Sequence, residues 1–175
     1  MLKQRIITAL VLLALLLPAL FAANPWPFMA LTVLMIAAGA WEWGRLNAMG
    51  SLWSWVGALV ALALCGLAQR SGWVQASPPQ LWLLAGAGWV LLGAWMICRG
   101  VAAWVLWPKT LRWLVGLFLL AMAWLAMAQA HQRGVNFLLS VLVLVWAADV
   151  FAYFFGRALG GRFIGVKLAP SISPG

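Results

Sequence analysis

Long apolar runs dominate this 175-residue chain and leave few ways for it to fold. A membrane-spanning helix needs about 17–25 mostly apolar residues, and six runs of about that length, the second slightly short, can be read. They cover residues 6–23, 27–41, 52–68, 81–98, 111–128 and 136–155. Only 7% of the residues are charged, whereas a water-soluble domain carries about 25%. The sequence therefore predicts an all-α, polytopic integral membrane protein with about six transmembrane helices.

The first run has a second interpretation. Lys3 and Arg5 precede an apolar stretch that ends in small residues at Ala22 and Ala23, a pattern that resembles a cleavable signal peptide. We favour a membrane span, because the run is long and another apolar run follows at once.

Lysine and arginine are distributed unevenly among the segments between the runs. If the N-terminus lies in the cytoplasm, nine of the eleven fall on the cytoplasmic side, and only Arg70 and Arg133 fall outside. Cytoplasmic segments are enriched in Lys and Arg, so this count predicts cytoplasmic termini. It also explains the net charge of +9 without a nucleic-acid partner. The cytoplasmic set is Lys3, Arg5, Arg45, Arg99, Lys109, Arg112, Arg157, Arg162 and Lys167.

The two acidic residues differ in setting. Glu42 ends the second run three residues before Arg45, a spacing that predicts an interfacial ion pair. Asp149 lies well inside the sixth run, where a carboxylate costs about 2.5–3.5 kcal/mol to insert. Tyr153 and Gly156 share its helical face, and Arg157 follows, so we expect a polar stripe that leads to the cytoplasm. Asp149 is a candidate functional residue; the alternative is a structural carboxylate bonded to neighbouring helices.

The segment from Gly156 to Lys167 is basic and rich in glycine. Glycines let backbone N–H groups approach phosphate oxygens, and Arg162 and Lys167 supply positive charge. Neither the P-loop pattern nor Gly-x-Gly-x-x-Gly is present. An anchor on anionic lipid headgroups explains the same composition, and spacing alone does not decide between the two.

The remaining polar residues offer no second site. His131 falls in a polar segment between the fifth and sixth runs, where we expect it to be solvated. One histidine and two acids cannot form a Ser-His-Asp set or a His/Cys metal cluster.

The last thirty residues carry a more specific signal. Asp149-x-x-Ala-Tyr153 is followed by Gly156-Arg157, and then by Lys167-Leu-Ala-Pro-Ser-Ile-Ser173-Pro174-Gly. This pattern resembles the phosphatidate cytidylyltransferase (CDP-diacylglycerol synthase) family of bacterial type. Phe151 departs from it, because that position is usually small, and a bulky ring there would change the shape of the cleft.

The resemblance implies a nucleotidyltransferase in phospholipid biosynthesis that converts CTP and phosphatidate to CDP-diacylglycerol and pyrophosphate with Mg²⁺. It implies catalytic roles for Asp149 and Lys167, with Asp149 also a metal ligand. The implied substrate-binding residues are Tyr153, Gly156, Arg157, Arg162, Ser173 and Pro174. It further implies a multi-pass protein of the bacterial inner membrane, in contact with membrane lipid, with a homodimer as one possible assembly.

The family pattern continues beyond Gly175, so we expect this chain to be an N-terminal part that is inactive alone, with the remaining metal ligands further on. We expect residues 1–135 to form N-terminal transmembrane helices, about five spans. Residues 136–175 would then hold the sixth span and a cytoplasmic loop, where the catalytic region starts. The alternative functions are a transporter or channel subunit, or a structural membrane protein. A transporter would predict inverted repeats, and none is evident in the sequence.

Overall fold

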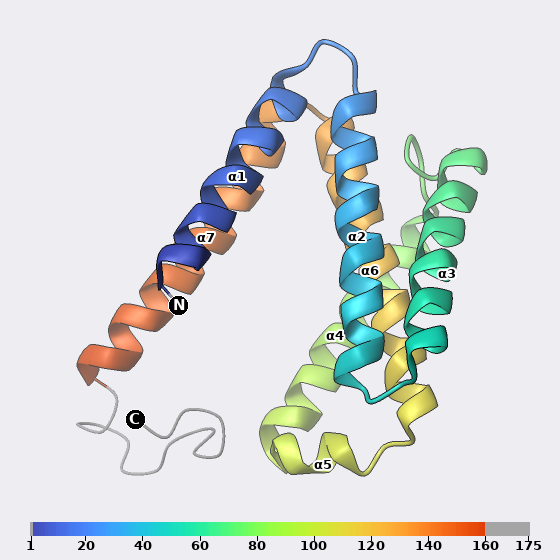
Figure 1. Cartoon of the computed structure of the whole chain (residues 1–175), viewed down its shortest axis with the longest axis vertical. Helices are drawn as coiled ribbons and strands as arrows, with labels where there is room; N and C mark the ends of the chain where they lie inside the picture. Colours follow the sequence, from blue (N-terminus) through green and yellow to red (C-terminus); the bar gives the residue numbers. More distant parts are fainter. Residues whose placement is uncertain (1, 160–175) are drawn as a thin grey trace.

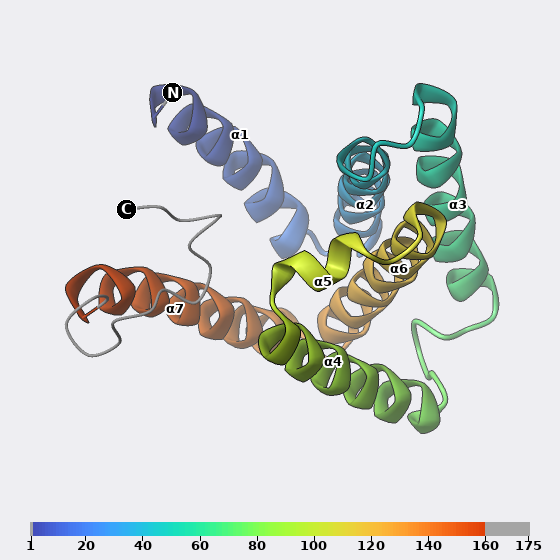
Figure 2. The ribbon, with the colours of Figure 1, turned by 90° about the horizontal axis from the view of Figure 1, so that it is seen from below.

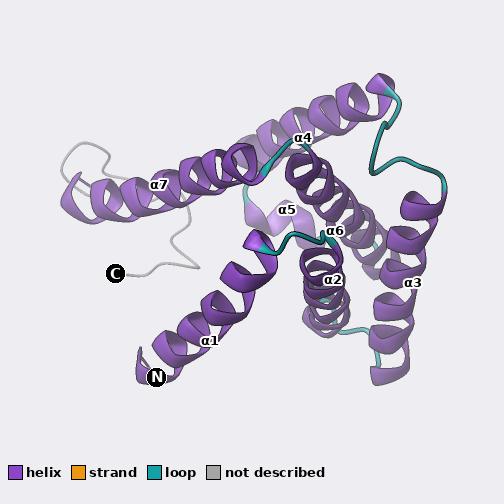
Figure 3. Cartoon of the chain, turned by 90° about the horizontal axis from the view of Figure 1, so that it is seen from above, coloured by secondary structure: helices purple, strands orange, loops and turns teal. Residues whose placement is uncertain are grey.

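The computed structural model describes residues 2–159, and it describes the side chains of all of these except residues 2–6, 8, 9, 101, 102 and 159. This part of the chain folds into seven helices and no strand (Figures 1 and 3). They are α1 (Leu2–Phe21), α2 (Trp26–Leu46), α3 (Ser51–Arg70), α4 (Pro79–Arg99), α5 (Val101–Val105), α6 (Lys109–Gln132) and α7 (Val135–Leu159).

The predicted all-α membrane architecture is confirmed. Five helices, α2, α3, α4, α6 and α7, are long and apolar enough to cross a membrane, and α1 contributes a shorter apolar helix, Leu10–Phe21, within the described residues. The helices run past the apolar residues that predicted them. The second run was expected to end at Trp41, whereas α2 continues to Leu46, because its last turn packs against α6.

The core lies between α2, α3 and α6, which pack side by side (Figures 1 and 2). Small residues let these helices approach closely, as is typical of helix packing in membranes. Ala40 on α2 and Ala61 on α3 are completely buried. A methyl group on Gly57 would lie 3.1 Å from the indole nitrogen of Trp113, which shows how tightly α3 meets α6.

The expectation that His131 is solvated was wrong. The residue belongs to α6, which continues through the polar sequence up to Gln132. Its ring stacks on Phe28 of α2 with centroids 4.4 Å apart and planes 12° from parallel. Its Nε2 atom is buried and has no hydrogen-bond partner. Packing against the first turn of α2 therefore outweighs the polarity of the local sequence.

The other helices diverge from this core. Figures 2 and 3 show α1, α4 and α7 pointing outward from α2, α3 and α6. No residue of α4 is buried, and the residues of α7 from Val143 onward are largely exposed. The C-terminal half of α7 therefore has exposed side chains on all of its faces.

Successive long helices alternate in direction, which gives the molecule two distinct ends. The C-terminal ends of α2, α4 and α7 lie at the same end as α5, low in Figure 1, and we call this the α5 end. The C-terminal ends of α3 and α6 lie at the opposite end, which we call the Arg133 end. The alternation agrees with the expected order of spans; which end faces the cytoplasm stays a prediction.

Two expected interfacial features lie at the α5 end. The predicted ion pair is present, with Arg45 Nη1 3.7 Å from Glu42 Oε2 and both side chains more than half exposed. The short helix α5 lies across the lower end of the molecule (Figure 1). Trp107 packs against Trp95 and Trp104, with ring centroids 5.3 Å apart in each pair. Such aromatic clusters are typical of a membrane interface.

Candidate functional site

The C-terminal half of α7 carries four of the predicted site residues: Asp149, Tyr153, Gly156 and Arg157. The helix continues unbroken through all four residues, and most of the positions between them are apolar. Residues three, four or seven apart lie on one side of an α-helix. The four residues therefore form the expected stripe toward the α5 end.

The stripe contains a direct contact between two of its members. Arg157 Nη1 donates a hydrogen bond to the phenol oxygen of Tyr153 over 3.1 Å. This bond uses the phenol oxygen as an acceptor, so the Tyr153 hydroxyl proton stays free to donate. The pair thus offers a guanidinium and a hydroxyl side by side. Both groups are suited to the oxygens of a phosphate.

Asp149 lies two helical turns before Arg157, about 12 Å along the axis at 1.5 Å per residue. Its side chain is exposed. Among the side chains that the structure describes, which do not include Lys3 and Arg5, no cation lies within ion-pair distance of it; the other acid, Glu42, pairs with Arg45. The alternative of a structural carboxylate bonded to neighbouring helices gains no support in this part of the chain. The carboxylate is therefore available to a metal ion or to a cationic group.

Aromatic and glycine residues shape the surface around the stripe. Phe151 and Phe155 lie along the helix with ring centroids 6.0 Å apart. A residue two positions from Asp149 lies about 200° around the helix axis, so Phe151 projects from the far face and leaves the stripe open. A methyl group on Gly156 would meet no atom within 4 Å. The stripe is thus accessible to a ligand.

The remaining predicted site residues, Arg162, Lys167, Ser173 and Pro174, lie outside the described residues. Their roles stay predictions. Within the described part, no group of three or more His, Cys, Asp or Glu side chains could hold a metal ion. The role of Asp149 as a metal ligand therefore stays a prediction.

Sequence reasoning assigned no site to the Arg133 end, where the structure has two adjoining cavities beside Trp82, Gln129 and Arg133. Arg133 was noted only as one of two cations outside the predicted cytoplasmic set. The signal that could have drawn attention to it is its position between two spans with no acidic residue nearby in the sequence.

Comparison with known proteins points to one family. A family model described as "Cytidylyltransferase family" matches residues 3–175. The chain is 36% identical to the phosphatidate cytidylyltransferase of Pseudomonas aeruginosa, covering all of this chain and 63% of that protein. It is 31% identical to the phosphatidate cytidylyltransferase of Haemophilus influenzae, covering all of this chain and 66% of that protein. An enzyme of the same name from Brucella abortus is 28% identical over 99% of this chain and 59% of its own length.

These matches agree with the resemblance read from the last thirty residues, and they do not favour a transporter or a structural subunit. The chain spans about three fifths to two thirds of the length of these relatives. No solved structure matches the chain.

Proposed function

Because this chain belongs to the cytidylyltransferase family, we propose that the protein containing it transfers a cytidylyl group from CTP to phosphatidate. The products are CDP-diacylglycerol and pyrophosphate. The observation that carries the proposal is the match along the whole chain to enzymes named phosphatidate cytidylyltransferase. The polar stripe of α7, the part of the predicted site that the structure describes, supports it.

The reaction requires the protein to hold two negatively charged reactants close together. A phosphate oxygen of phosphatidate attacks the α-phosphorus of CTP, and the bond from that phosphorus to the β-phosphate bridging oxygen breaks. Pyrophosphate leaves with the electron pair. Both reactants are anions, so the protein must bring negative groups together and hold them in line, and catalysis of such transfers rests on positioning and on electrostatic stabilisation.

Arg157 and Tyr153 are suited to part of this task. The hydrogen bond between them fixes the guanidinium along α7, which lowers the conformational entropy lost when it binds a phosphate. In our proposal this pair, beside the open surface at Gly156, binds phosphate oxygens. Arg162 and Lys167 add positive charge from the segment that follows, with Lys167 close to the reacting phosphate, and Ser173 and Pro174 complete the substrate-binding region.

We propose Mg²⁺ as the metal, since enzymes that transfer nucleotidyl groups generally use a divalent cation. Mg²⁺ is usually bound by one or two carboxylates together with substrate phosphates and water. The exposed carboxylate of Asp149 fits that description as one ligand. When bound, the ion would neutralise charge on the triphosphate. The other protein ligands would come from residues beyond this sequence.

The location of the reaction follows from the predicted topology. We propose that the α5 end faces the cytoplasm, where CTP is available, and that the protein lies in the bacterial inner membrane with its acyl-chain substrate in the same bilayer. We further propose that residues 136–175 open the catalytic region, whereas residues 1–135 form its membrane support. The exposed faces of α4 and α7 leave room for a second copy of the chain in a homodimer.

The proposal is tested with the natural gene product that contains this chain, purified in detergent and supplied with CTP, Mg²⁺ and phosphatidate. We expect CDP-diacylglycerol and pyrophosphate in equal amounts. Diacylglycerol, which lacks the attacking phosphate, should give no lipid product. Failure to form the liponucleotide from a well-folded preparation would refute the proposal, and product from diacylglycerol would refute the stated chemistry.

A further inference from the structure

A pair of adjoining cavities lies at the Arg133 end, far along the bundle from the polar stripe of α7. Their volumes are about 210 and 410 Å³, and Trp82, Gln129 and Arg133 line both of them. The smaller is completed by Ala126, Ala130 and Phe137, where α4 and α6 approach the start of α7. The larger is completed mainly by the α3–α4 connection, including Gln75 and Ser77. One cavity is therefore mostly apolar, and its neighbour is polar.

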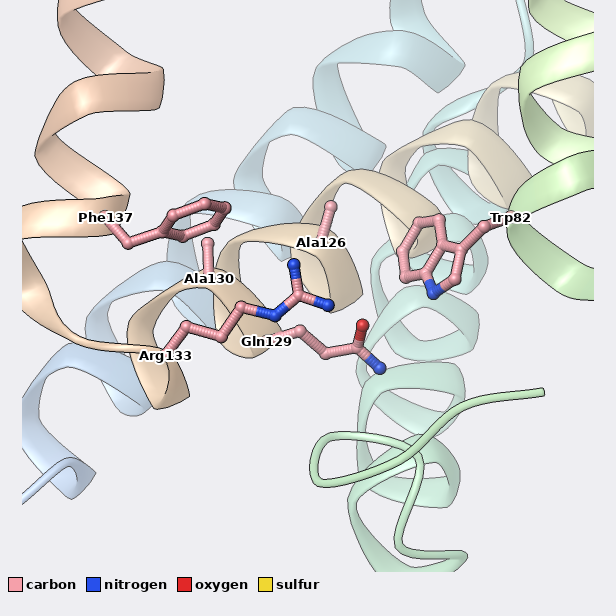
Figure 4. Close-up of a pocket in the computed structure, with 6 residues that line it drawn as sticks. All are labelled: Trp82, Ala126, Gln129, Ala130, Arg133 and Phe137. Atoms are coloured by element: carbon pink, nitrogen blue, oxygen red, sulfur yellow. The ribbon is translucent and has the colours of Figure 1, made fainter. Parts of the chain in front are cut away.

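The positive charge in these cavities has no counter-ion in the described part of the chain. Figure 4 shows the Arg133 side chain extending over α6, so that its guanidinium lies between Phe137 and Trp82. Its Cζ atom is 5.5 Å from the centre of the Phe137 ring. No carboxylate lies within ion-pair distance of Arg133 among residues 2–159. The side chain of Arg133 is exposed and rests on one aromatic ring, so its charge is free to bind an anion from outside the chain.

Three hydrogen-bonded side chains, those of Ser77, Trp82 and Gln129, line the larger cavity beside the guanidinium. Ser77 Oγ accepts one hydrogen bond from Trp82 Nε1 over 2.6 Å and another from Gln129 Nε2 over 2.8 Å. Two accepted bonds use the lone pairs of the hydroxyl and leave its proton free to donate. These bonds join α4 and α6 through the α3–α4 connection. They also place a second donor on the surface that carries Arg133.

The surface next to the smaller cavity is apolar. On α4, Ala85 and Trp89 lie three and seven residues after Trp82 on the same helical face, and Trp89 is 66% exposed. On α7, Val141 lies one turn beyond Phe137 and is 40% exposed. A tryptophan and an arginine at helix ends, with aliphatic side chains beyond them, are typical of the boundary between headgroups and acyl chains. A ligand here would place a charged end on Arg133 and an apolar end along α4 and α7.

We propose that these cavities bind the phosphate of an anionic phospholipid, with its glycerol and first acyl carbons against Trp82 and Phe137. The site is separate from the stripe of α7 and does not depend on the proposed reaction. Under the predicted topology, the bound lipid belongs to the outer leaflet. We commit to a phospholipid over a free phosphate ion, because the aromatic and aliphatic surfaces would contribute nothing to binding inorganic phosphate.

The test uses the natural full-length protein, purified in detergent and incubated with a phosphatidylglycerol that carries a photoreactive diazirine near the glycerol. Cross-linked peptides are mapped by mass spectrometry. We expect labelling within α4 near Trp82 and at the start of α7 near Phe137. Arg133→Gln should reduce this labelling about fivefold, as expected from one interfacial cation, and Arg133→Lys should largely restore it. Arg70→Gln, which removes the other cation of this end, is the matched control and should leave it unchanged.

Two further arms identify the ligand. Excess unlabelled phosphatidylglycerol should compete, whereas inorganic phosphate and zwitterionic phosphatidylcholine should compete poorly. Displacement by inorganic phosphate at equal concentration would show a free-anion site and overturn the proposal. Equal labelling of the wild type and Arg133→Gln would overturn it as well. Thermal unfolding of each variant in the same detergent shows whether it is folded. If Arg133→Gln is unfolded, the labelling of Arg133→Lys tests the proposal in its place.

Discussion

Arg157 donates a hydrogen bond from Nη1 to the phenol oxygen of Tyr153, one turn earlier on α7, over 3.1 Å. The two residues are thus one unit of the polar stripe, in which the phenol sets the position of the cation. This contact connects the sequence pattern of the last thirty residues to a definite geometry.

Tyr153→Phe removes that hydrogen bond and keeps the ring. A hydrogen bond of this kind contributes about 1 kcal/mol, so the apparent KM for CTP should rise about fivefold, with a smaller change in kcat. Steady-state kinetics of the full-length protein measure both values. Phe155→Leu, a change to an aromatic neighbour with no hydrogen bond, serves as the control. An unchanged KM in Tyr153→Phe would show that the pair does not position substrate.

Gly116 of α6 tests the packing of the core. The indole of Trp43 lies directly over it and donates to the Arg112 carbonyl over 3.2 Å, so a methyl group on Gly116 would collide with the ring. Gly116→Ala should therefore destabilise the protein by about 1–3 kcal/mol. Melting in detergent, followed by tryptophan fluorescence, measures the effect as a lower Tm.

Gly66→Ala is the matched control for that variant. It makes the same change on α3, where a methyl group meets no atom within 4 Å, and helix propensity alone would favour alanine by up to about 1 kcal/mol. Its Tm should stay the same or rise. Equal Tm values for the two alanine variants would contradict the close contact between α2 and α6.

The topology can be read from a cysteine that the protein already has. Cys98 is exposed near the C-terminal end of α4, at the α5 end, whereas Cys65 is buried. A membrane-impermeant maleimide should label Cys98 only from the cytoplasmic side. In a Cys98→Ser background, Ser71→Cys at the Arg133 end should be labelled only from outside. Labelling of both cysteines from the same side would refute the alternation, and the reverse pattern would refute the orientation.

Much of the fold could be predicted from the sequence, because each membrane-spanning helix corresponds to one apolar run of residues. The set of helices that forms the core could not be read from hydropathy, since α4 is as apolar as α3 and yet buries no residue. A better signal was the set of small residues at close spacing, such as Ala40 with Gly44, and Gly57 with Ala61. The stacking of His131 on Phe28 was missed because local polarity says nothing about a neighbouring helix.

The site was predicted more unevenly. Helical spacing alone predicted that Asp149, Tyr153 and Gly156 share a face and that Arg157 follows, since that relation is local. The cavities beside Arg133 arise from contacts between the α3–α4 connection and α6, segments more than fifty positions apart in sequence. No local pattern encodes such a contact.

Residues 1–175 expressed alone should insert into membranes and yet form no CDP-diacylglycerol. The chain holds two carboxylates, and Glu42 pairs with Arg45, which leaves Asp149 without the further ligands that a metal site requires. The assay is CTP incorporation into lipid by membranes from a host depleted of its own enzyme. Binding of nucleotide to Arg157 and its basic neighbours should be weak and should fade with salt. Robust incorporation by this segment would contradict the placing of the other ligands beyond it.

If the stripe of α7 carries cytidylyl transfer, as we claim, turnover must depend on its carboxylate, and one comparison of variants measures that dependence. Radiolabelled CTP incorporation into lipid is measured in membranes that carry equal amounts of the full-length protein, its Asp149→Asn variant and its Glu42→Gln variant. Each substitution removes one of the two acidic charges of residues 1–175 and keeps the size of the side chain. Loss of a catalytic carboxylate typically lowers turnover by about 10²–10⁴-fold, so we predict a loss of at least about a hundredfold for Asp149→Asn and near-normal turnover for Glu42→Gln. Near-normal turnover in Asp149→Asn at a normal protein level would contradict the claim.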